Sequence, residues 1–465
     1  MAVRGRARSA LAVVAGSARR CSSAMLRQPA RVVALAFVLV IALGAVLLML
    51  PVASESGAAT PWVPALFTAA SAVCVNGLLV VDTAGHWSTF GELVVLALVQ
   101  VGGFGIMTLA SLLGLLVTRR IGLRMQRGAQ VETKTFGLGD VRRVVLGVIL
   151  LSSVVEVLTS LVLSARLATG YGYQLGDAIY AGVYHGVSAF NNAGFALYPD
   201  SLVRFGTDPW ICLPVVAAFV LGGLGFPVLF ELVRHARGQQ RRWSLHTRIT
   251  LGAYGALAVI GVVAVTALEW DNPGTLGPRG AGGKLLAGFF QGMSPRTAGF
   301  NTVDVGEMHP ASLLVTDVLM FVGGGSGGTA GGIKVTTFAL LGFVMLAEIR
   351  GEPNVHVLDR KLPREVHRQA LTVVLAGVGL VLAATLALLV LTPFRLDSVL
   401  FEAASAFGTT GLSTGITGDL PPAGHLVLVV LMFAGRIGPI TFASALALRE
   451  RGRRYDLPEE RPIVG

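Results

Sequence analysis

The chain has 465 residues, of which 53% are hydrophobic and only 14% are charged, and its mean hydropathy is +0.71. An ordinary soluble domain carries about 25% charged residues, so this composition excludes a soluble globular protein and indicates a membrane-embedded one. The formal net charge is +11. Its cations gather in alternate connections between apolar segments, so membrane topology accounts for the charge and we expect no binding to nucleic acid.

Eight apolar stretches reach the length of roughly 20 residues that a helix needs to cross a bilayer. They are residues 31–50, 92–118, 143–165, 210–233, 248–268, 312–348, 370–391 and 424–448. Within each successive pair lies a shorter apolar piece, and these four are residues 62–73, 177–190, 283–293 and 397–407. Because they are too short to cross, we interpret them as re-entrant helices. Asp177 and Asp397 open two of them, which suits a helix start by capping and by the helix dipole.

Each short piece leads into a glycine that is followed by a large apolar residue. The four motifs are Cys74-Val-Asn-Gly-Leu78, Asn191-Asn-Ala-Gly-Phe195, Arg296-Thr-Ala-Gly-Phe300 and Gly408-Thr-Thr-Gly-Leu412. Their glycines are 117, 105 and 112 residues apart, which indicates four copies of one unit. An even number of crossings per unit keeps the copies parallel, so an axis along the membrane normal can relate them.

Glycine adopts a positive φ at no steric cost, so these turns can aim backbone carbonyls at an ion in place of its water shell. We therefore predict an ion filter from the three residues that end at each glycine. They are Val75, Asn76, Gly77, Asn192, Ala193, Gly194, Thr297, Ala298, Gly299, Thr409, Thr410 and Gly411. One such motif would be explained as well by a helix-terminating glycine in a tight turn. Ser71, Ser188 and Ser405 lie six residues before their glycines, and the third unit has Met293 there.

Seven glycines in the ten residues 323–332 interrupt the apolar segment 312–348. In a continuous helix they would cost about 7 kcal/mol relative to alanine, so the helix is predicted to break. Irregular backbone at membrane depth must be buried in protein or line a wet cavity, which predicts a gate across the pore. Close helix packing through small residues is the alternative, and a phosphate-binding loop is disfavoured because no strand precedes it. The predicted gate comprises Gly323, Gly324, Gly325, Ser326, Gly327, Gly328, Thr329, Ala330, Gly331, Gly332, Lys334 and Arg436.

Arg436 lies near the middle of the last apolar segment, where a cation costs about 2.5 to 3.5 kcal/mol. It is therefore expected to face the interior and to bond carbonyls of 323–332 or an acid such as Glu402, with extension to the membrane surface as the alternative. For Lys334 the gating and surface interpretations both stay open. Three acids toward the ends of segments are expected to be solvated or paired: Glu156, Glu231 and Glu348. No nucleophile, base and orienting group occur together, so we expect no enzyme.

Orientation follows from the cations, because 29 of the 37 Lys and Arg residues lie in alternate connections and the tails. The positive-inside rule assigns those regions, and both termini, to the cytoplasm. The predicted organisation is a cytoplasmic tail 1–30, repeats 31–125, 126–240, 241–352 and 353–448, and a cytoplasmic tail 449–465. The fold class is an all-α membrane protein with eight transmembrane helices and four re-entrant pore helices, in four pseudo-symmetric repeats around a central pore.

Over residues 31–448 these motifs resemble the ion-translocating membrane subunit of the Trk/Ktr/HKT superfamily of potassium transporters, with the length of the Ktr type. The resemblance implies potassium uptake across the plasma membrane, a homodimer surrounded by membrane lipid, and a cytoplasmic nucleotide-binding ring that gates it. It also implies a preference for potassium, because a serine at a filter glycine accompanies sodium transport in the family.

The chain departs from the family pattern at Asn76, where a hydroxyl residue is more usual. No covalently bound cofactor is expected. Potassium is the expected transported ion, and sodium is a candidate activator. A sodium- or proton-coupled cation carrier of similar architecture is the alternative function.

Overall fold

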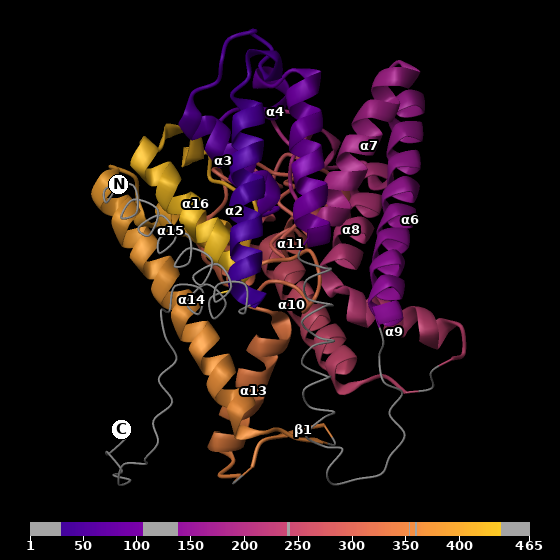
Figure 1. The fold of residues 1–465 in the computed structure, drawn as a ribbon, viewed down its shortest axis with the longest axis vertical. Helices are drawn as coiled ribbons and strands as arrows, with labels where there is room; N and C mark the ends of the chain where they lie inside the picture. The colour runs from indigo at the N-terminus through magenta and orange to yellow at the C-terminus, as the bar shows by residue number, and fades with distance from the viewer. Residues whose placement is uncertain (1–28, 106–137, 240–241, 353, 359, 439–465) are drawn as a thin grey trace, which may run out of the picture.

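The computed structural model describes residues 29–105, 138–239, 242–352, 354–358 and 360–438 (Figure 1). These residues are mostly helical. The long and medium helices are α2 (Pro29–Leu48), α3 (Trp62–Val73), Thr89–Gly105, α6 (Leu138–Gly170), α7 (Leu175–Asn191), α8 (Pro209–Leu224), α9 (Phe226–Ala236), α10 (Leu245–Glu269), α11 (Ala281–Met293), α12 (Pro310–Phe321), α13 (Val335–Ile349), α14 (Arg364–Leu391), α15 (Leu396–Gly408) and α16 (Pro422–Ile437). The predicted tail 449–465 and nearly all of the tail 1–30 lie outside the described residues.

Short elements connect them. They are the α-helical turn α4 (Thr83–His86), the 3₁₀ turns η1 (Pro51–Ala53), η2 (Val203–Phe205) and η3 (Ile416–Asp419), and an antiparallel hairpin of β1 (His356–Val357) with β2 (Arg360–Lys361). The hairpin, with the end of α13 and the start of α14 that it joins, lies at the lower end of the described structure in Figure 1.

Three described helices are long and apolar enough to cross a membrane: Val145–Gly170, Leu245–Glu269 and Glu365–Leu391. A fourth is obtained if α8 and α9, which meet at 106°, are counted as one broken span. The other apolar helices of the described part are shorter than the eight predicted crossings. Two of those predictions, 92–118 and 424–448, continue into residues that are not described.

Glycine breaks explain the short helices. Gly225 separates α8 from α9 with φ 91° and ψ 143°, and Gly438 ends α16 with almost the same angles, φ 93° and ψ 141°. The predicted single segment 312–348 is two helices, α12 and α13, with the glycine run between them. A residue with a side chain rarely adopts this backbone conformation, so each glycine fixes where its helix ends.

The four short helices predicted before the glycine motifs are α3, α7, α11 and α15. The capping prediction for two of them was wrong. The N-cap residues are Gln174 for α7 and Arg395 for α15, and neither caps with its side chain. Asp177 and Asp397 lie instead in the first turn, where a carboxylate still interacts favourably with the helix dipole.

Helix packing follows the repeats in a closed cycle. Each of α3, α7, α11 and α15 packs against the helix before it, α2, α6, α10 and α14. Each neighbouring repeat is then joined in the same way: α8 contacts α11, α12 contacts α15, and α16 contacts α3. The fourth junction is a side-chain hydrogen bond from Asn191 of α7 to Gln100 of the helix Thr89–Gly105. The contacts among these helices therefore close into a cycle of four junctions.

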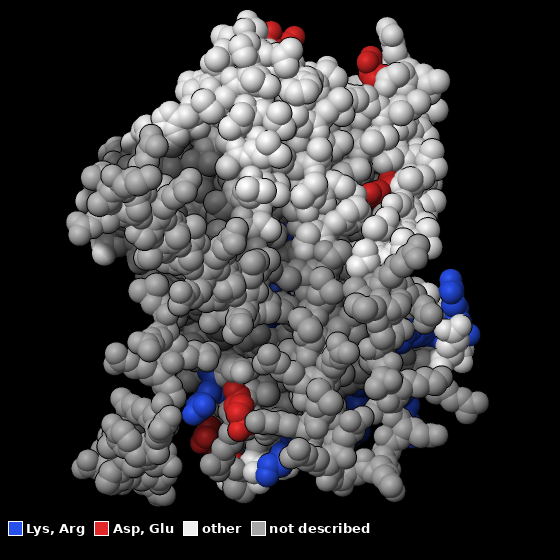
Figure 2. Space-filling model, viewed as in Figure 1, with Lys and Arg blue, Asp and Glu red and all other residues white. Residues whose placement is uncertain are grey.

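The described surface is consistent with a lipid environment. Large apolar side chains are exposed on the outer helices, among them Leu39, Leu150 and Val390 at 71%, 67% and 79%. On the face drawn in Figure 2, the Lys and Arg side chains lie mostly toward the lower end. This asymmetry is the one that the positive-inside rule describes.

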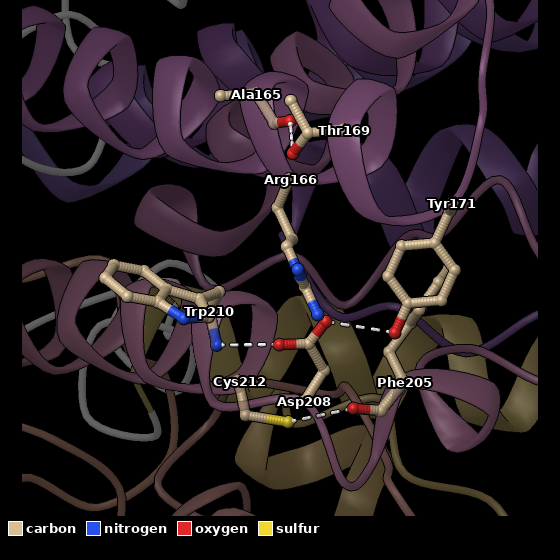
Figure 3. Close-up of polar contacts among 8 residues, drawn as sticks. All are labelled: Ala165, Arg166, Thr169, Tyr171, Phe205, Asp208, Trp210 and Cys212. Carbon is tan, nitrogen blue, oxygen red and sulfur yellow. Dashed lines mark hydrogen bonds and ion pairs between the residues drawn. The ribbon is translucent and has the colours of Figure 1, made fainter.

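One polar cluster ties together two helix ends of the second repeat (Figure 3). Asp208, at the N-cap of α8, accepts the backbone N–H of Trp210 at 2.9 Å. Its other carboxylate oxygen accepts Nε of Arg166 at 2.6 Å and the hydroxyl of Tyr171 at 3.0 Å. The carboxylate therefore satisfies an otherwise unpaired helix N–H and pins the end of α6 to the start of α8.

Candidate functional site

The four predicted filter loops, residues 75–77, 192–194, 297–299 and 409–411, meet in a ring. A Cβ atom placed on Gly77 would lie 3.1 Å from the Cα of Gly194, and one on Gly194 would lie 2.8 Å from the Cα of Gly299. A Cβ on Gly299 would contact the carbonyl oxygen of Thr410, and one on Gly411 would lie 2.9 Å from the Cα of Gly77. Each loop therefore touches the next one around the centre, and the contacts close on themselves.

The backbone follows the same alternating pattern in all four loops. In each one the glycine and the residue two positions before it have positive φ. The glycines have φ values of 94°, 69°, 78° and 91°, and the preceding residues are Val75 at 53°, Asn192 at 59°, Thr297 at 72° and Thr409 at 49°. Successive carbonyls of an extended strand point to opposite sides, and a left-handed residue at every second position turns them toward a common side. Such strained backbone, at about 1 to 3 kcal/mol per residue, is typical of functional sites.

A serine hydroxyl anchors each loop to the helix before it. Ser71 donates to the carbonyl of Leu78 at 2.9 Å and accepts the N–H of Gly77 at 3.1 Å, and Ser188 donates to the carbonyl of Phe195 at 2.8 Å. Ser405 accepts the N–H of Gly411 at 3.1 Å.

In the third unit the predicted place of that serine holds Met293, and the structure shows that Ser294 takes its role. The Ser294 hydroxyl donates to the carbonyl of Phe300. Its own carbonyl accepts the N–H of Ala298 at 2.9 Å, as the carbonyl of Ser188 accepts Ala193 at 2.8 Å. A search for serine at fixed spacing misses it by one residue.

The asparagines of the filter loops bond across repeat boundaries. Asn76 donates from Nδ2 to the carbonyl of Ala406 at 3.2 Å, and Asn192 donates to the Thr297 hydroxyl at 3.2 Å. The side chain at the position where this chain departs from the family pattern is thus bonded to a neighbouring helix, which leaves the backbone carbonyls as the repeated feature of the ring.

Glycines of the following helices allow a close approach to the loops. Gly102, Gly222 and Gly435 each lie against a backbone carbonyl four residues before a filter glycine, namely that of Val73, Phe190 or Phe407. A Cβ at any of these three positions would collide with the carbonyl oxygen. Small residues at these positions therefore allow the helices to pack closely against the loops.

The glycine loop, residues 323–332, lies directly against the filter loops. Backbone hydrogen bonds hold its two ends together, from Gly323 N–H to the Ile333 carbonyl at 2.8 Å and from Val335 N–H to the Gly324 carbonyl at 3.0 Å. Thr329 donates its hydroxyl to Oδ1 of Asn192 at 3.0 Å. A Cβ on Gly331 would collide with the side chain of Thr409. The loop is therefore bonded to the second filter loop and packed against the fourth.

Further hydrogen bonds attach the glycine loop to α8 and to the break after it. Gly325 N–H bonds the carbonyl of Gly223 at 2.8 Å, and Thr329 N–H bonds that of Gly222 at 3.1 Å. Phe226 N–H bonds the carbonyl of Gly327 at 3.3 Å. Part of the irregular backbone is thus hydrogen-bonded within the protein, and burial in protein is the condition for such backbone at membrane depth.

Arg436 is buried, with 3% of its surface exposed, and it faces the interior as predicted. Its Nη1 donates to the carbonyl of Thr329, and its Nη2 donates to the carbonyl of Gly102 at 3.2 Å. Of the two kinds of partner that the sequence suggested, the carbonyls are the ones observed. Glu402 was the wrong choice, because it bonds Ser413, Thr414 and Thr417 instead.

Lys334 is the N-cap residue of α13, and its ammonium group donates to the carbonyl of Ala330. It therefore bonds the glycine loop itself. Among the described residues, no group of three or more His, Cys, Asp or Glu side chains could hold a metal ion.

Two further buried polar groups lie next to the loops, and the sequence interpretation missed their importance. Arg296, directly before the third filter loop, is fully buried and donates to the carbonyl of Leu319 at 3.3 Å. Glu156 was expected to lie toward the end of its apolar segment and to be solvated or paired. It lies instead in the middle of α6, and only 6% of its surface is exposed. It accepts Nε2 of Gln100 at 3.1 Å and Nδ2 of Asn191 at 3.3 Å.

Comparison with known proteins identifies the family. Residues 7–451, nearly the whole chain, match the model of TrkH, described as "Cation transport protein". The chain belongs to this family of cation transport proteins. The family assignment confirms the predicted resemblance, and it confirms that the protein is a membrane transport protein rather than an enzyme.

Individual relatives cover the chain almost from end to end. It is 40% identical over 428 residues to "Ktr system potassium uptake protein B" of Bacillus subtilis, with 92% of this chain and 95% of the relative covered. It is 32% identical over 443 residues to "Potassium/sodium uptake protein NtpJ" of Enterococcus hirae, covering 94% and 97%. The crystal structure of the potassium transporter TrkH from Vibrio parahaemolyticus has a TM-score of 0.71 at 18% identity, covering 91% of this chain and 85% of that one. This last similarity concerns the fold.

Proposed function

We propose that the protein takes up potassium across the plasma membrane through the ring of four filter loops. The observation that carries the proposal is the closed ring itself, in which four loops with the same alternating backbone meet at their glycines. Such backbone can present several layers of carbonyl oxygens to one axis, and carbonyl oxygens replace the water shell of an alkali cation. Relatives at 40% and 38% identity are named as potassium uptake proteins, which supports potassium as the ion.

The proposed membrane arrangement has eight crossings and four re-entrant pore helices, in the repeats 31–125, 126–240, 241–352 and 353–448. Both termini are proposed to lie in the cytoplasm. The cyclic packing of α3, α7, α11 and α15 against neighbouring repeats supports the fourfold arrangement. The cation asymmetry along the chain supports the orientation.

The glycine loop is proposed to be the gate, with Lys334 and Arg436 as its anchors. Its contacts with Asn192 and Thr409 support a position next to the filter, where a movement of the loop would open or close the ion path. Control of such a gate requires a partner whose binding favours the open or the closed loop. We propose a homodimer whose cytoplasmic face binds a nucleotide-binding ring, and the relatives' printed names, which speak of a "Ktr system", support a partner subunit.

Uptake of radioactive rubidium tests the proposal. A host that lacks its own potassium uptake should accumulate rubidium when it expresses this chain with a cytoplasmic partner, and excess potassium should compete. Uptake that depends on a proton gradient and is indifferent to potassium would contradict the proposal. Measuring with and without sodium decides whether sodium activates transport, a question raised by the potassium/sodium name of the relative NtpJ.

A further inference from the structure

A cavity of about 680 Å³ lies apart from the filter loops, where the end of α9, the start of α10 and the β1–β2 hairpin meet. Its size is within the range of about 300 to 1,000 Å³ that is typical of small-molecule sites. Its lining residues are His235, Arg242, Trp243, Ser244, Leu245, Arg248 and Arg360.

The cavity is strongly cationic. Arg242 comes from the connection between α9 and α10, Arg248 from the first turn of α10, and Arg360 from β2 of the hairpin. The described lining contains no Asp or Glu. Glu231 is not among the lining residues, and its carboxylate accepts the hydroxyl of Ser244, the N-cap residue of α10, at 2.7 Å. Three arginines from separate segments of the chain thus line one hollow.

Guanidinium chemistry suits a phosphate in this position. Each guanidinium has five N–H donors in a fixed fork, so contacts with the protein leave donors for a ligand. Arginine forks bind phosphate oxygens in pairs, with shorter and stronger hydrogen bonds than neutral groups make. A phosphate seated among the three would also link the α9–α10 connection to the hairpin between α13 and α14.

The surroundings favour a lipid as the source of that phosphate. Trp243 is 41% exposed, and its ring meets that of His235 edge-on at 5.5 Å. Exposed tryptophan is typical of the membrane–water boundary. Leu245 begins α10, one of the apolar helices long enough to cross a membrane, and further along it Val259 and Val263 are 63% and 62% exposed. Acyl chains can lie along this helix while the headgroup occupies the cavity.

We propose that this cavity binds the headgroup of an anionic phospholipid, with Arg242, Arg248 and Arg360 holding its phosphate. Basic pockets at the cytoplasmic ends of membrane helices recognise lipid headgroups by this chemistry. The site is separate from the filter, and its occupancy is measured by binding rather than by ion flux, so its test is independent of the proposed transport function.

Native mass spectrometry of the delipidated, purified protein provides the test, with phosphatidylglycerol and phosphatidylcholine as probes. We expect phosphatidylglycerol to be retained at least tenfold more tightly. Arg242→Gln, Arg248→Gln and Arg360→Gln should each weaken it roughly fivefold, the effect of one cation near an anionic headgroup. Arg237→Gln is the matched control, because Arg237 is an exposed cation at the end of α9 outside the cavity.

Two results would overturn the proposal. One is equal retention of phosphatidylglycerol by the cavity variants and the Arg237 control, measured on samples with matched thermal unfolding. The other is competition by inorganic phosphate at concentrations similar to those of the lipid, which would identify a site for free phosphate. If a glutamine variant does not fold, the corresponding Arg→Lys variant replaces it and should show an intermediate loss, since lysine keeps the charge without the fork.

Discussion

Arg436 of α16 and Thr329 of the glycine loop are 107 residues apart in the chain, and the guanidinium of the first donates to the backbone carbonyl of the second. The same guanidinium reaches the carbonyl of Gly102 in the first repeat at 3.2 Å. One buried cation therefore holds the glycine loop between the fourth and first repeats. Since the loop also bonds Asn192, Arg436 is positioned to hold the loop against the proposed filter.

Arg436→Ala should raise basal rubidium flux, because the loop loses its charge-assisted hydrogen bond. Removing one partner of a buried hydrogen bond costs about 1 to 3 kcal/mol, so the variant should unfold at a somewhat lower temperature. Arg436→Lys should restore only part of the closure, because an ammonium group lacks the planar fork. Arg395→Ala, which removes an exposed arginine, is the control. Parental flux in Arg436→Ala would show that the arginine is structural.

Thr329→Val tests the role of the Thr329 hydroxyl independently of the role of its backbone carbonyl. Valine has nearly the same shape, so the carbonyl bond to Arg436 should persist while the hydroxyl bond to Asn192 is lost. We expect a smaller rise in flux than in Arg436→Ala and an altered rubidium-to-sodium ratio, since only the contact with the filter changes. If the ratio and the flux both stay at parental values, the bond between Thr329 and Asn192 does not couple gate and filter.

Gly77→Ser should shift selectivity toward sodium while the protein remains folded. The residue has φ 94°, and an added Cβ would press on the second loop at Ala193 and Gly194, so the carbonyl ring must widen or twist there. Gly57→Ser is the control, because Gly57 also has positive φ, 67°, but an added Cβ meets nothing within 4 Å. Ion discrimination in reconstituted vesicles is the measurement. An unchanged ratio in Gly77→Ser would count against Gly77 as a filter residue.

Ser294→Ala should weaken the third filter loop as Ser188→Ala weakens the second. Each change removes a hydroxyl that bonds the carbonyl of the residue after the filter glycine, and a hydrogen bond of this kind contributes about 1 kcal/mol. Met293→Leu is the control, since it changes the position predicted by spacing and leaves the hydroxyl bond intact. The thermal midpoint and the rubidium-to-sodium ratio are measured. A lower thermal midpoint or an altered ion ratio in Met293→Leu, with parental values in Ser294→Ala, would show that Met293 and not Ser294 supports the third loop.

Glu156→Ala should destabilise the protein by about 1 to 3 kcal/mol and alter ion selectivity. It deprives Gln100 Nε2 of its observed acceptor and loosens Asn191, the residue that precedes the second filter loop. Glu156→Gln keeps one acceptor oxygen and should be milder. Glu348→Gln, at an exposed glutamate, is the control. Equal thermal midpoints for Glu156→Ala and the parent would show that the hydrogen bonds of Glu156 do not stabilise the loop.

The sequence by itself determined the four glycine motifs, the four short helices before them and the helix break within 312–348. It did not predict the breaks at Gly225 and Gly438, which interrupt the predicted segments 210–233 and 424–448. The predicted features depend on local backbone requirements, because a positive φ or a helix break favours glycine at that position. The same glycine therefore recurs at a similar spacing in each unit. Gly77, Gly194, Gly299 and Gly411 are recognisable for this reason, and the glycine run predicts its own interruption of the segment 312–348.

Only the tertiary structure decided which groups meet. Arg436 could have paired with a carbonyl or with Glu402, and the choice depends on how α16 approaches the glycine loop. Ser294, rather than the residue at the repeated spacing, Met293, supplies the hydroxyl in the third unit. There α11 ends six residues before its filter glycine, whereas α3, α7 and α15 end four, three and three residues before theirs. Glu156 of α6 meets Gln100 and Asn191, which come from two other helices, and the packing of these helices against α6 buries its carboxylate. Contacts of this kind join residues that are distant along the chain, so no local pattern encodes them.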